Sequence, residues 1–531
     1  MPLALLVIVP AALGLLAFVL RRVRVVLGIL LVGAAAHLAV VCTLWLAPGA
    51  PAGAAVAGMG TGALLALDPL GLLFLSLTSL LFLMCALYTV PYLLSGTHDQ
   101  PAHPHRFVPC LLWFLAAMTL VTVSHNLALM WAAVEATTLA SAPLVYFYRR
   151  RGALEAAWKY LLICSVGIAL ALLGVFFIGI AASAVPAAAS AGGAGAEGAA
   201  SGGAALTLSA LIEAAPSMPR SWLKAAFVLA LVGFGTKMGL APLHTWLPDT
   251  HSQAPSPVSA LLSGALLNCA FLAILRFYQV CVAAGEPGFA QTLLVLLGLV
   301  SIGVACAFMI AQRDYKRLFA YSSIENMGVI AAGMGLGGGA AYGALLHAVN
   351  HSLCKAGLFF LAGNILREFG TTAAAEARGV LRRLPVTGAL LTALFLAIGG
   401  TPPFGPFVSE FLIFKAGIGG PAPWTGGDPA PWVGVVFLAL LAVAFLGMAG
   451  VLLPMLQGDP GVRAAGAPPG DAGPPAAAGR PAGAPPAGPR SEQVLTILAP
   501  ILMTLAALAL GVHLPAWLDD LLRRAAALVG G

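Results

Sequence analysis

Long apolar stretches alternate with short polar or Gly/Pro-rich stretches along the whole chain. Many apolar runs reach 18 residues or more, which is enough for a helix to cross the roughly 30 Å hydrocarbon core of a bilayer. The alternating segments of about ten residues that are typical of a membrane β-barrel are absent from the sequence. We therefore predict an all-α polytopic membrane protein with about fourteen transmembrane helices. The approximate limits of these spans are 3–20, 25–47, 68–95, 107–123, 126–148, 157–183, 222–247, 257–280, 290–310, 319–336, 339–366, 387–418, 431–456 and 493–513.

The composition excludes a soluble protein. The 531 residues are 60% hydrophobic and 8% charged, with a mean hydropathy of +0.98, whereas soluble domains carry roughly 25% charged residues. The eight cysteines lie scattered in apolar segments without CxxC spacing, so iron–sulfur ligation finds no support. We expect no cofactor in this chain and no nucleic-acid partner, and we expect a lipid bilayer around it.

Basic residues mark the sides of the membrane. Clusters at 21–24, 149–151, 313–317 and 367–383 fall in alternate loops of the predicted fourteen spans, and 463–490 falls on the same side. Because short cytoplasmic loops are enriched in Lys and Arg, these loops are predicted to be cytoplasmic. We expect a multi-pass protein of the cell inner (plasma) membrane with both termini on the outer face.

Two predicted spans are interrupted next to a charge. The span at 222–247 carries Lys237 within "LVGFGTKMGLAPLHTWLPDTHSQAPSPVSALLSG", where glycine and prolines follow at once. The span at 387–418 contains "GGTPPFGPFVSEF", with Glu410 behind three prolines. Each is the fourth of five spans, in 107–280 and in 290–456. Since five is odd, the second unit enters the bilayer from the opposite face, which predicts two inverted five-helix repeats, each with one discontinuous helix.

This pattern divides the chain into five regions. We predict an N-terminal three-helix segment at 1–95, a first repeat at 107–280 and a second repeat at 290–456. The Pro/Gly/Ala-rich stretch at 458–490 is predicted to be a disordered linker, and 493–531 to be a C-terminal helix and tail.

A buried pair of opposite charges is the first candidate site. A lysine or carboxylate at the bilayer centre costs on the order of 2.5–3.5 kcal/mol. Glu135 and Lys237 each lie near the middle of a predicted span, and opposite charges in a low dielectric keep each other ionised. We predict a proton-handling pair, because the adjacent helix break makes room for water. The alternative is a static ion pair that fastens two helices.

A second candidate lies in "LLHAVNHSLCKAGLFF". His347, His351 and Lys355 stand at i, i+4 and i+8, so on a helix they share one face at steps of about 6 Å. Two imidazoles that lead to a buried lysine make a plausible proton wire. Interhelical hydrogen bonding is the alternative. Haem ligation is disfavoured because both histidines lie on the same helix.

The remaining candidates lie beside the helix breaks. Glu410 is predicted to be a terminal proton acceptor, or alternatively a cap on the restarting half-helix. His244, Asp249 and His251 are candidates for proton uptake from the cytoplasm, or are hydrated loop residues. Glu325 lies near the cytoplasmic edge of its span, and its role stays open at this point.

Four long motifs in this order carry a family resemblance. They are "KMGLAPLHTWLPDTHSQAPSPVSALLSG", "YSSIENMG", "HAVNHSLCKAGLFFLAGNI" and "GTPPFGPFVSEF". Over residues 68–456 the chain resembles the antiporter-like membrane subunits of respiratory complex I, Mrp-type sodium/proton antiporters and membrane-bound hydrogenases. The stretch "ALLSGALLNCAFLAILRF" looks most like the F component of hydrogenase-4-type complexes.

The resemblance implies fourteen helices, two inverted repeats and a central axis of charged residues. On that pattern Glu135 and Lys237 match the paired glutamate and lysine, Lys355 matches the lysine after the paired histidines, and Glu410 matches the acidic end of the axis. The chain departs from the pattern at Asn268, where several complex I relatives have a lysine.

We therefore predict a proton-translocating membrane subunit of a hydrogenase-4-like or complex I-like (NADH:quinone oxidoreductase-type) complex. It would carry no redox centre itself and would couple redox chemistry in its partners to proton movement. The expected partners are other membrane subunits and a peripheral redox arm, nickel–iron hydrogenase-like or quinone-reductase-like. The alternative is a subunit of an Mrp-type cation/proton antiporter or ion-gradient-driven uptake complex without a redox partner.

Overall fold

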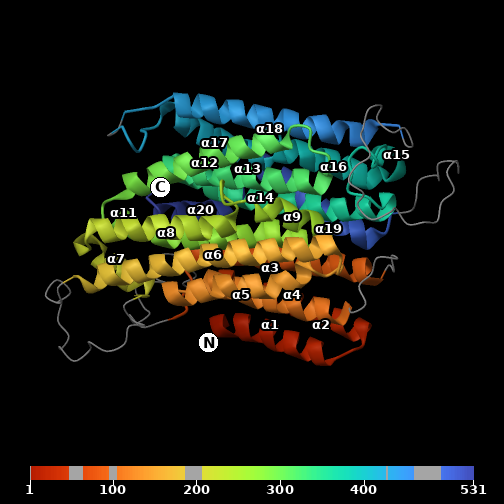
Figure 1. Ribbon diagram of the computed structural model, residues 1–531, viewed down its shortest axis with the longest axis horizontal. Coiled ribbons are helices and arrows are strands. Elements are labelled where there is room, and N and C mark those ends of the chain that lie inside the picture. Colours follow the sequence, from red (N-terminus) through yellow and green to blue (C-terminus); the bar gives the residue numbers. More distant parts are fainter. Residues whose placement is uncertain are drawn as a thin grey trace.

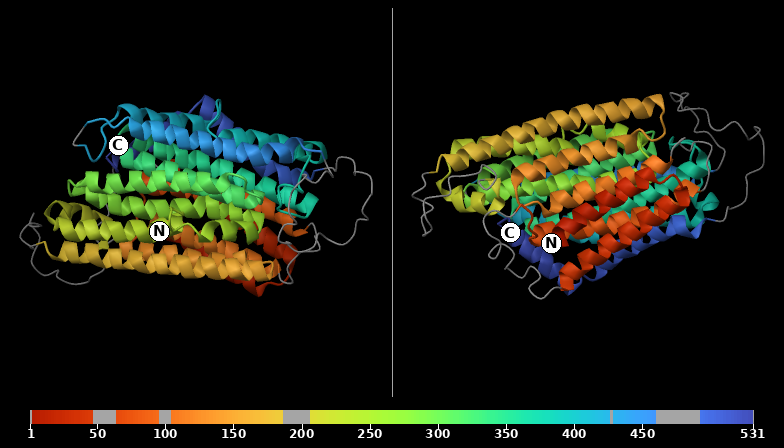
Figure 2. Two further views of the ribbon diagram at one scale, coloured as in Figure 1. Left: turned by 45° about the horizontal axis from the view of Figure 1, so that its top comes forward. Right: turned by 90° about the horizontal axis from the view of Figure 1, so that it is seen from below.

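The structure is a computed structural model that describes residues 2–46, 64–94, 104–185, 206–425, 428–459 and 492–530. Within these ranges the secondary structure is helical, apart from four isolated bridges between single residues. The helices run side by side and form an elongated bundle (Figure 1). The start of the first helix and the end of the last lie toward the same end of this bundle (Figures 1 and 2).

The predicted spans are helical apart from breaks inside 222–247 and 387–418, and the prediction of an all-α membrane protein is confirmed. Within the described residues, ten helices are long and apolar enough to cross a membrane. The number of crossings and the inverted repeats stay predictions. The uninterrupted α-helices are α1 (Pro2–Val19), α2 (Val23–Leu46), α3 (Pro69–Leu94), α4 (Phe107–Val123), α5 (Leu127–Val145), α6 (Arg151–Ser183), α7 (Leu208–Ala214), α12 (Pro287–Met309), α13 (Tyr315–Leu336), α14 (Gly339–Phe369), α15 (Val380–Arg383), α18 (Trp432–Gln457), α19 (Val494–Val512) and α20 (Ala516–Ala527).

The first predicted break separates α8 (Arg220–Met238) from α9 (Trp246–Gln253). Helix α8 ends at Gly239, whose φ of +84° lies in the left-handed region that glycine tolerates best. The break is held from both sides. The Trp246 indole N–H donates to the Thr236 carbonyl at 2.8 Å, and the Ala241 N–H donates to the Ser301 hydroxyl of α12 at 2.9 Å.

The second predicted break separates α16 (Pro385–Ile398) from α17 (Gly405–Gly419). Gly400 has a φ of +67°, and the prolines that follow cannot donate the backbone hydrogen bonds that would continue the helix. The Thr401 N–H and hydroxyl both bond to the Leu396 carbonyl, at 3.1 and 2.8 Å. The end of α16 is therefore satisfied locally although the helix stops inside the bundle.

A third irregularity was not predicted. Between α10 (Ser256–Leu261) and α11 (Leu267–Ala283) lies a π-helical turn, η5 (Leu262–Leu266). Such a turn widens the helix by one residue and leaves carbonyl groups available to other donors. Here the Ser263 carbonyl accepts from His351 at 3.3 Å, and the Gly264 carbonyl accepts from Asn268 and Ser352 at 3.0 and 2.8 Å.

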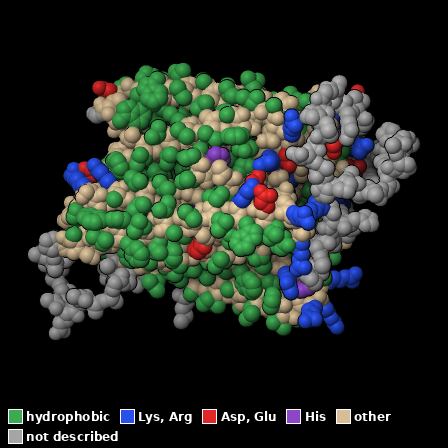
Figure 3. Space-filling view, in the orientation of Figure 1, with side chains coloured by type: hydrophobic (Ala, Val, Ile, Leu, Met, Phe, Trp, Pro, Cys, Tyr) green, Lys and Arg blue, Asp and Glu red, His purple; other side chains and the backbone are tan. Residues whose placement is uncertain are grey.

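Burial divides the helices into an interior and a boundary. The membrane-span windows of Ser256–Ala283 and α14 are entirely buried, whereas those of α6, α18 and α19 are 39%, 33% and 33% buried. On the face drawn in Figure 3 the surface is mostly hydrophobic, and most Lys and Arg side chains lie toward one end. An apolar surface along the bundle, with basic side chains gathered toward an end, is typical of a protein that lies in a lipid bilayer.

The C-terminal region holds one more helix than predicted. After α19, the tail forms the short amphipathic helix α20, which packs on α3 and α14. The Tyr342 hydroxyl of α14 donates to Asp519 at 2.6 Å, and Leu521 and Leu522 are buried. Most of the predicted linker at 458–490 lies outside the described residues.

Candidate functional site

The first group of buried polar residues surrounds Lys237 in the last turn of α8. This side chain has no exposed surface. Its ammonium donates to the Thr138 hydroxyl at 2.7 Å and to the Tyr160 hydroxyl at 2.6 Å, and it lies 4.5 Å from the centroid of the Tyr160 ring. Two neutral hydroxyls and an aromatic face stabilise a buried cation without fixing it to an anion.

Glu135 is joined to this lysine through Thr138. On half-buried Glu135, Oε1 accepts from the Ser165 hydroxyl at 3.0 Å and Oε2 accepts from the Thr138 hydroxyl at 3.3 Å. No direct ion pair links Glu135 to Lys237 in the described part of the chain. The sequence placed the two charges as a pair, and the structure inserts one hydroxyl between them. That hydroxyl can pass a change of charge from one to the other.

Tyr160 extends the group away from the lysine. Its hydroxyl lies 2.7 Å from the Ser141 hydroxyl, which donates to the Thr137 carbonyl at 2.6 Å. The hydroxyls of Thr138, Tyr160 and Ser141 can each donate and accept. The arrangement is therefore a branched set of relay groups centred on Lys237. We call Glu135, Thr138, Tyr160, Ser141 and Lys237 the first cluster.

The second group surrounds Lys355 of α14, which is also fully buried. Its ammonium donates to the Ser322 hydroxyl at 2.6 Å and to the Phe319 carbonyl at 3.2 Å. Both partners lie on α13, ahead of buried Glu325 on the same helix. The Glu325 carboxylate accepts a hydrogen bond from the neighbouring Asn326 amide. Glu325, whose role the sequence left open, thus belongs to the interior.

The two histidines of α14 have different partners. His347 Nε2 donates to the Asn326 side-chain carbonyl at 3.0 Å, and its Nδ1 is hydrogen-bonded to the Ser409 hydroxyl at 2.9 Å. His351 Nε2 donates to the Ser263 carbonyl of the π turn. Among the described residues no hydrogen bond joins His347, His351 and Lys355 to one another. The hydrogen bonds of the two histidines run across helices, and the relay along one face of α14 stays a prediction.

Glu410 follows Ser409 on α17, directly after the second break. Its side chain is 8% exposed. A Cβ at Gly400 would overlap the Glu410 carboxylate, so the carboxylate occupies the space that the absent side chain leaves in the break. We call Lys355, Ser322, Glu325, Asn326, His347, Ser409 and Glu410 the second cluster.

The three uptake candidates are separate from one another. Asp249 forms ion pairs with Arg317 and with Lys159, the latter at 3.0 Å, beside a polar pocket of about 120 Å³. His251 is buried, its ring stacks on Phe359 at 4.8 Å, and neither ring nitrogen has a partner among the described residues. His244 lies in the first break and packs near aromatic rings. No described hydrogen bond connects the three side chains.

Several interior residues were missed by the sequence analysis. Thr138 stands one turn after Glu135, and this spacing was an available signal. Ser322 and Asn326 lie within the quoted motif "YSSIENMG". Lys316 was grouped with a surface loop, yet it is 1% exposed and donates to the Ala254 carbonyl at 2.6 Å. Nothing in its sequence position distinguishes it from the neighbouring arginines.

Asn268 lies between the two clusters in sequence and bridges two interior helices. Its amide donates to the Ser352 hydroxyl of α14 at 2.6 Å, while its carbonyl oxygen has no described partner. A buried orphan acceptor is a position that an ordered water commonly fills. Asn268, the position at which the sequence departs from the family pattern, thus contributes a neutral hydrogen-bonding group.

Known proteins resemble this chain in sequence and in fold. The model of the family described as "NADH:quinone oxidoreductase/Mrp antiporter, TM" matches residues 124–425, a range that contains both clusters. The chain is 37% identical over 359 residues to a Hydrogenase-4 component F homolog of Methylacidiphilum infernorum (isolate V4), covering 67% of this chain and 73% of that protein.

Solved structures show the same fold. A chain of respiratory complex I from Thermus thermophilus superposes with a TM-score of 0.69 at 26% identity, covering 96% of this chain and 97% of that one. A chain of the Mrp complex from Dietzia sp. DQ12-45-1b gives a TM-score of 0.80 at 20% identity, covering 99% and 97%. The second likeness concerns the fold alone.

Proposed function

The chain belongs to the NADH:quinone oxidoreductase/Mrp antiporter family of membrane subunits, and from this premise we propose that it translocates protons within a larger membrane complex. The observation that carries the proposal is a set of charges inside the bundle, namely half-buried Glu135 and buried Lys237, Lys355 and Glu410, embedded among hydroxyl, amide and imidazole groups. Charges at this depth are costly. The hydroxyl and imidazole groups beside these charges can accept and donate protons, so the charges can take part in proton transfer.

We propose that the change of charge begins at Glu135, because its side chain is the most exposed of the four. The Thr138 hydroxyl then reorients, and Lys237 takes up or releases a proton. The changed charge of Lys237 then alters the protonation of Lys355. The change continues through Asn326 and His347 to Glu410, which exchanges a proton with the outer side of the membrane. Asp249, His251 and His244 supply protons from the cytoplasmic side.

The finer architecture belongs to the same proposal. We propose fourteen crossings and two inverted repeats at 107–280 and 290–456. The positions of the two broken helices, each the fourth of its unit, support the repeats. The alternate basic loops support an inner-membrane orientation with both termini outside. The regions 1–95 and 493–531 would then frame the repeats as accessory helices.

We propose other membrane subunits as direct partners and a peripheral redox arm as the source of energy. The similarity to a hydrogenase-4 component homolog and to a complex I chain supports this arm, which would be nickel–iron hydrogenase-like or quinone-reductase-like. No redox centre is assigned to this chain.

The decisive test is Lys237→Ala in the assembled complex, with proton uptake followed by a pH-sensitive dye in sealed membrane vesicles. We expect the variant to insert and assemble while proton translocation falls to background, because no other buried ammonium replaces Lys237 at Thr138 and Tyr160. The control is Lys415→Ala, which removes an exposed lysine of α17. Normal translocation in the Lys237 variant would show the mechanism to be wrong.

The partners are identified by gentle purification of the tagged chain followed by mass spectrometry. Recovery of hydrogenase-like or quinone-reductase-like subunits would support the redox-coupled function. Recovery of multi-span subunits without any metalloprotein would instead favour the Mrp-type antiporter.

A further inference from the structure

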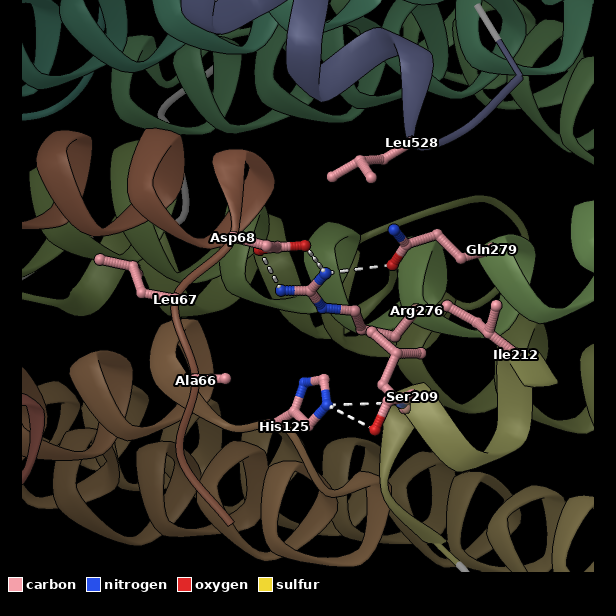
Figure 4. Close-up of a pocket in the computed structure, with 10 residues that line it drawn as sticks. Ala66, Leu67, Asp68, His125, Ser209, Ile212, Arg276, Gln279 and Leu528 are labelled. Carbon is pink, nitrogen blue, oxygen red and sulfur yellow. Dashed lines mark hydrogen bonds and ion pairs between the residues drawn. The ribbon is translucent and has the colours of Figure 1, made fainter. Parts of the chain in front are cut away.

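A small pocket lies at the end of the bundle where α5 begins, opposite the end that holds Asp249. It has a volume of about 40 Å³ (Figure 4). Residues from five separate segments line it: the stretch before α3, the α4–α5 turn, α7, α11 and the end of α20. In the proposed orientation this is the outer face of the membrane. None of the pocket residues belongs to either cluster.

A buried ion pair forms one wall of the pocket. Arg276 of α11 is 3% exposed and binds both carboxylate oxygens of Asp68, with Nη2 at 2.8 Å from Oδ1. Its Nη1 also donates to the Gln279 side chain at 3.0 Å. Asp68 in turn accepts from the Gly71 N–H at 2.7 Å, which caps the first turn of α3. The pair therefore ties the start of α3 to the end of α11.

His125 faces this ion pair from the α4–α5 turn (Figure 4). Its backbone N–H donates to the Leu64 carbonyl at 2.9 Å, and its carbonyl accepts from the Leu208 N–H at 2.8 Å. Its Nε2 lies 3.1 Å from the Ser209 hydroxyl and accepts from the Ser209 N–H at 3.4 Å. A nitrogen that accepts must be unprotonated, so this contact requires the neutral imidazole.

The surroundings of His125 favour that neutral form. The charged residues that line the pocket are Asp68, from the stretch before α3, and Arg276, from α11. The groups from α7 and α20 are Ser209, Leu208, Ile212 and Leu528, which carry no charge. Burial lowers the pKa of His125, the positive charge of Arg276 lowers it further, and the carboxylate of Asp68 opposes both.

The stability of this part of the fold depends on pH through His125. Because the folded pKa lies below the ordinary value of about 6.5, the fold gains stability from neutral His125 above that pH. The gain is lost as the pH falls from there through the lower, folded pKa. Acid on this face thus removes the acceptor for Ser209 and adds a second positive charge beside Arg276.

We propose that the Asp68–Arg276–His125 pocket is a proton-sensing latch. When His125 takes a proton from the outer medium, its ring releases the Ser209 N–H, α7 loosens from the α4–α5 turn, and the hold of Asp68 on Arg276 weakens. Arg276 lies on the same helix as Asn268, which binds Ser352 of α14. The latch is therefore connected by one rigid element to the interior, and its opening slows translocation as protons accumulate outside. This regulatory role rests on the proposed function.

The structural step is tested by hydrogen–deuterium exchange of the full chain in nanodiscs between pH 8 and pH 5. After correction for intrinsic exchange, we expect amides of 206–214 to exchange faster at low pH by on the order of tenfold. His125→Gln keeps an acceptor but cannot be protonated, so it should remove this dependence. His513→Gln, at an exposed histidine at the end of α19, should keep it. An unchanged wild type, or the same acceleration in His125→Gln, would overturn the latch.

The regulatory step is tested separately by translocation rates at varied outer pH in sealed vesicles. The wild type should slow as the outer medium acidifies, and His125→Gln should slow less. Equal slowing in both would overturn the regulation. Absence of translocation at every pH would overturn the proposed function instead, while the exchange result would still stand. If His125→Gln fails to fold, a histidine NMR titration of the wild type must show a signal that titrates below about 6.5 together with the exchange change.

Discussion

The two buried lysines rest on different kinds of support. In the first cluster Lys237 binds two side-chain hydroxyls, and one of these, Thr138, also serves the carboxylate of Glu135. In the second cluster Lys355 binds one hydroxyl and a backbone carbonyl. In the second cluster the Glu325 carboxylate accepts from the Asn326 amide, and the Glu410 carboxylate lies against Gly400. Neither carboxylate shares a described hydroxyl with Lys355.

The first cluster therefore links its lysine and its carboxylate through one hydroxyl, whereas the second cluster has no such shared group among its described residues. A shared hydroxyl makes the protonation of Lys237 sensitive to events at Glu135, because turning one O–H bond alters both contacts. A backbone carbonyl cannot turn in this way, so Lys355 is held more firmly on one side. In the second cluster the change of charge must instead travel through Asn326, His347 and Ser409.

Among substitutions that leave both buried lysines in place, the largest effect is expected from Gly400→Ala in the second break. The new Cβ would overlap the Glu410 carboxylate and displace it. Translocation should fall on the order of a hundredfold, the loss that a displacement of about 1 Å can cause at a reacting group. Gly370→Ala is the control: its φ of +71° is close to that of Gly400, but its Cβ meets open space. Similar losses in both variants would mean that strain, and not Glu410, is responsible.

An intermediate effect is expected from Thr138→Val. This substitution removes the shared hydroxyl, so the lysine and the carboxylate of the first cluster are no longer linked, as in the second cluster. It removes two hydrogen bonds to charged groups, each worth on the order of 1.5–3 kcal/mol. Translocation should therefore fall about tenfold or more. The adjacent Thr137→Val is the control, since the Thr137 hydroxyl donates to the Val134 carbonyl of its own helix. Dye-monitored proton uptake that is equal in the two variants would contradict the bridging role of Thr138.

The smallest effect is expected from Ser322→Ala. Lys355 keeps the Phe319 carbonyl, so translocation should fall less than about tenfold. Ser323→Ala serves as the control, because its hydroxyl binds Ser263 and shares the Phe319 carbonyl with Lys355 but makes no hydrogen bond to Lys355 itself. A larger loss in Ser322→Ala than in Thr138→Val, measured in the same vesicles, would reverse the comparison between the clusters.

The sequence predicted the helices and both breaks because these depend on local chemistry. Length and apolar composition define the spans, and the glycines and prolines at 239–242 and 400–403 disfavour an uninterrupted helix. The partners of the buried charges depend instead on how each helix is rotated. Several spans are apolar on every side, so the pattern does not reveal which face turns inward. For this reason Thr138 and Tyr160 were missed and Lys316 was misplaced.

The π turn at 262–266 has a consequence for comparing this chain with its relatives. The turn holds one residue more than a regular α-helix of the same length. A relative with a regular helix here would need a one-residue gap in its alignment. Without the gap, every later position of α11 would be paired with a residue about 100° around the helix. Whether Asn268 aligns with the lysine of another family member thus depends on where this one-residue gap is placed.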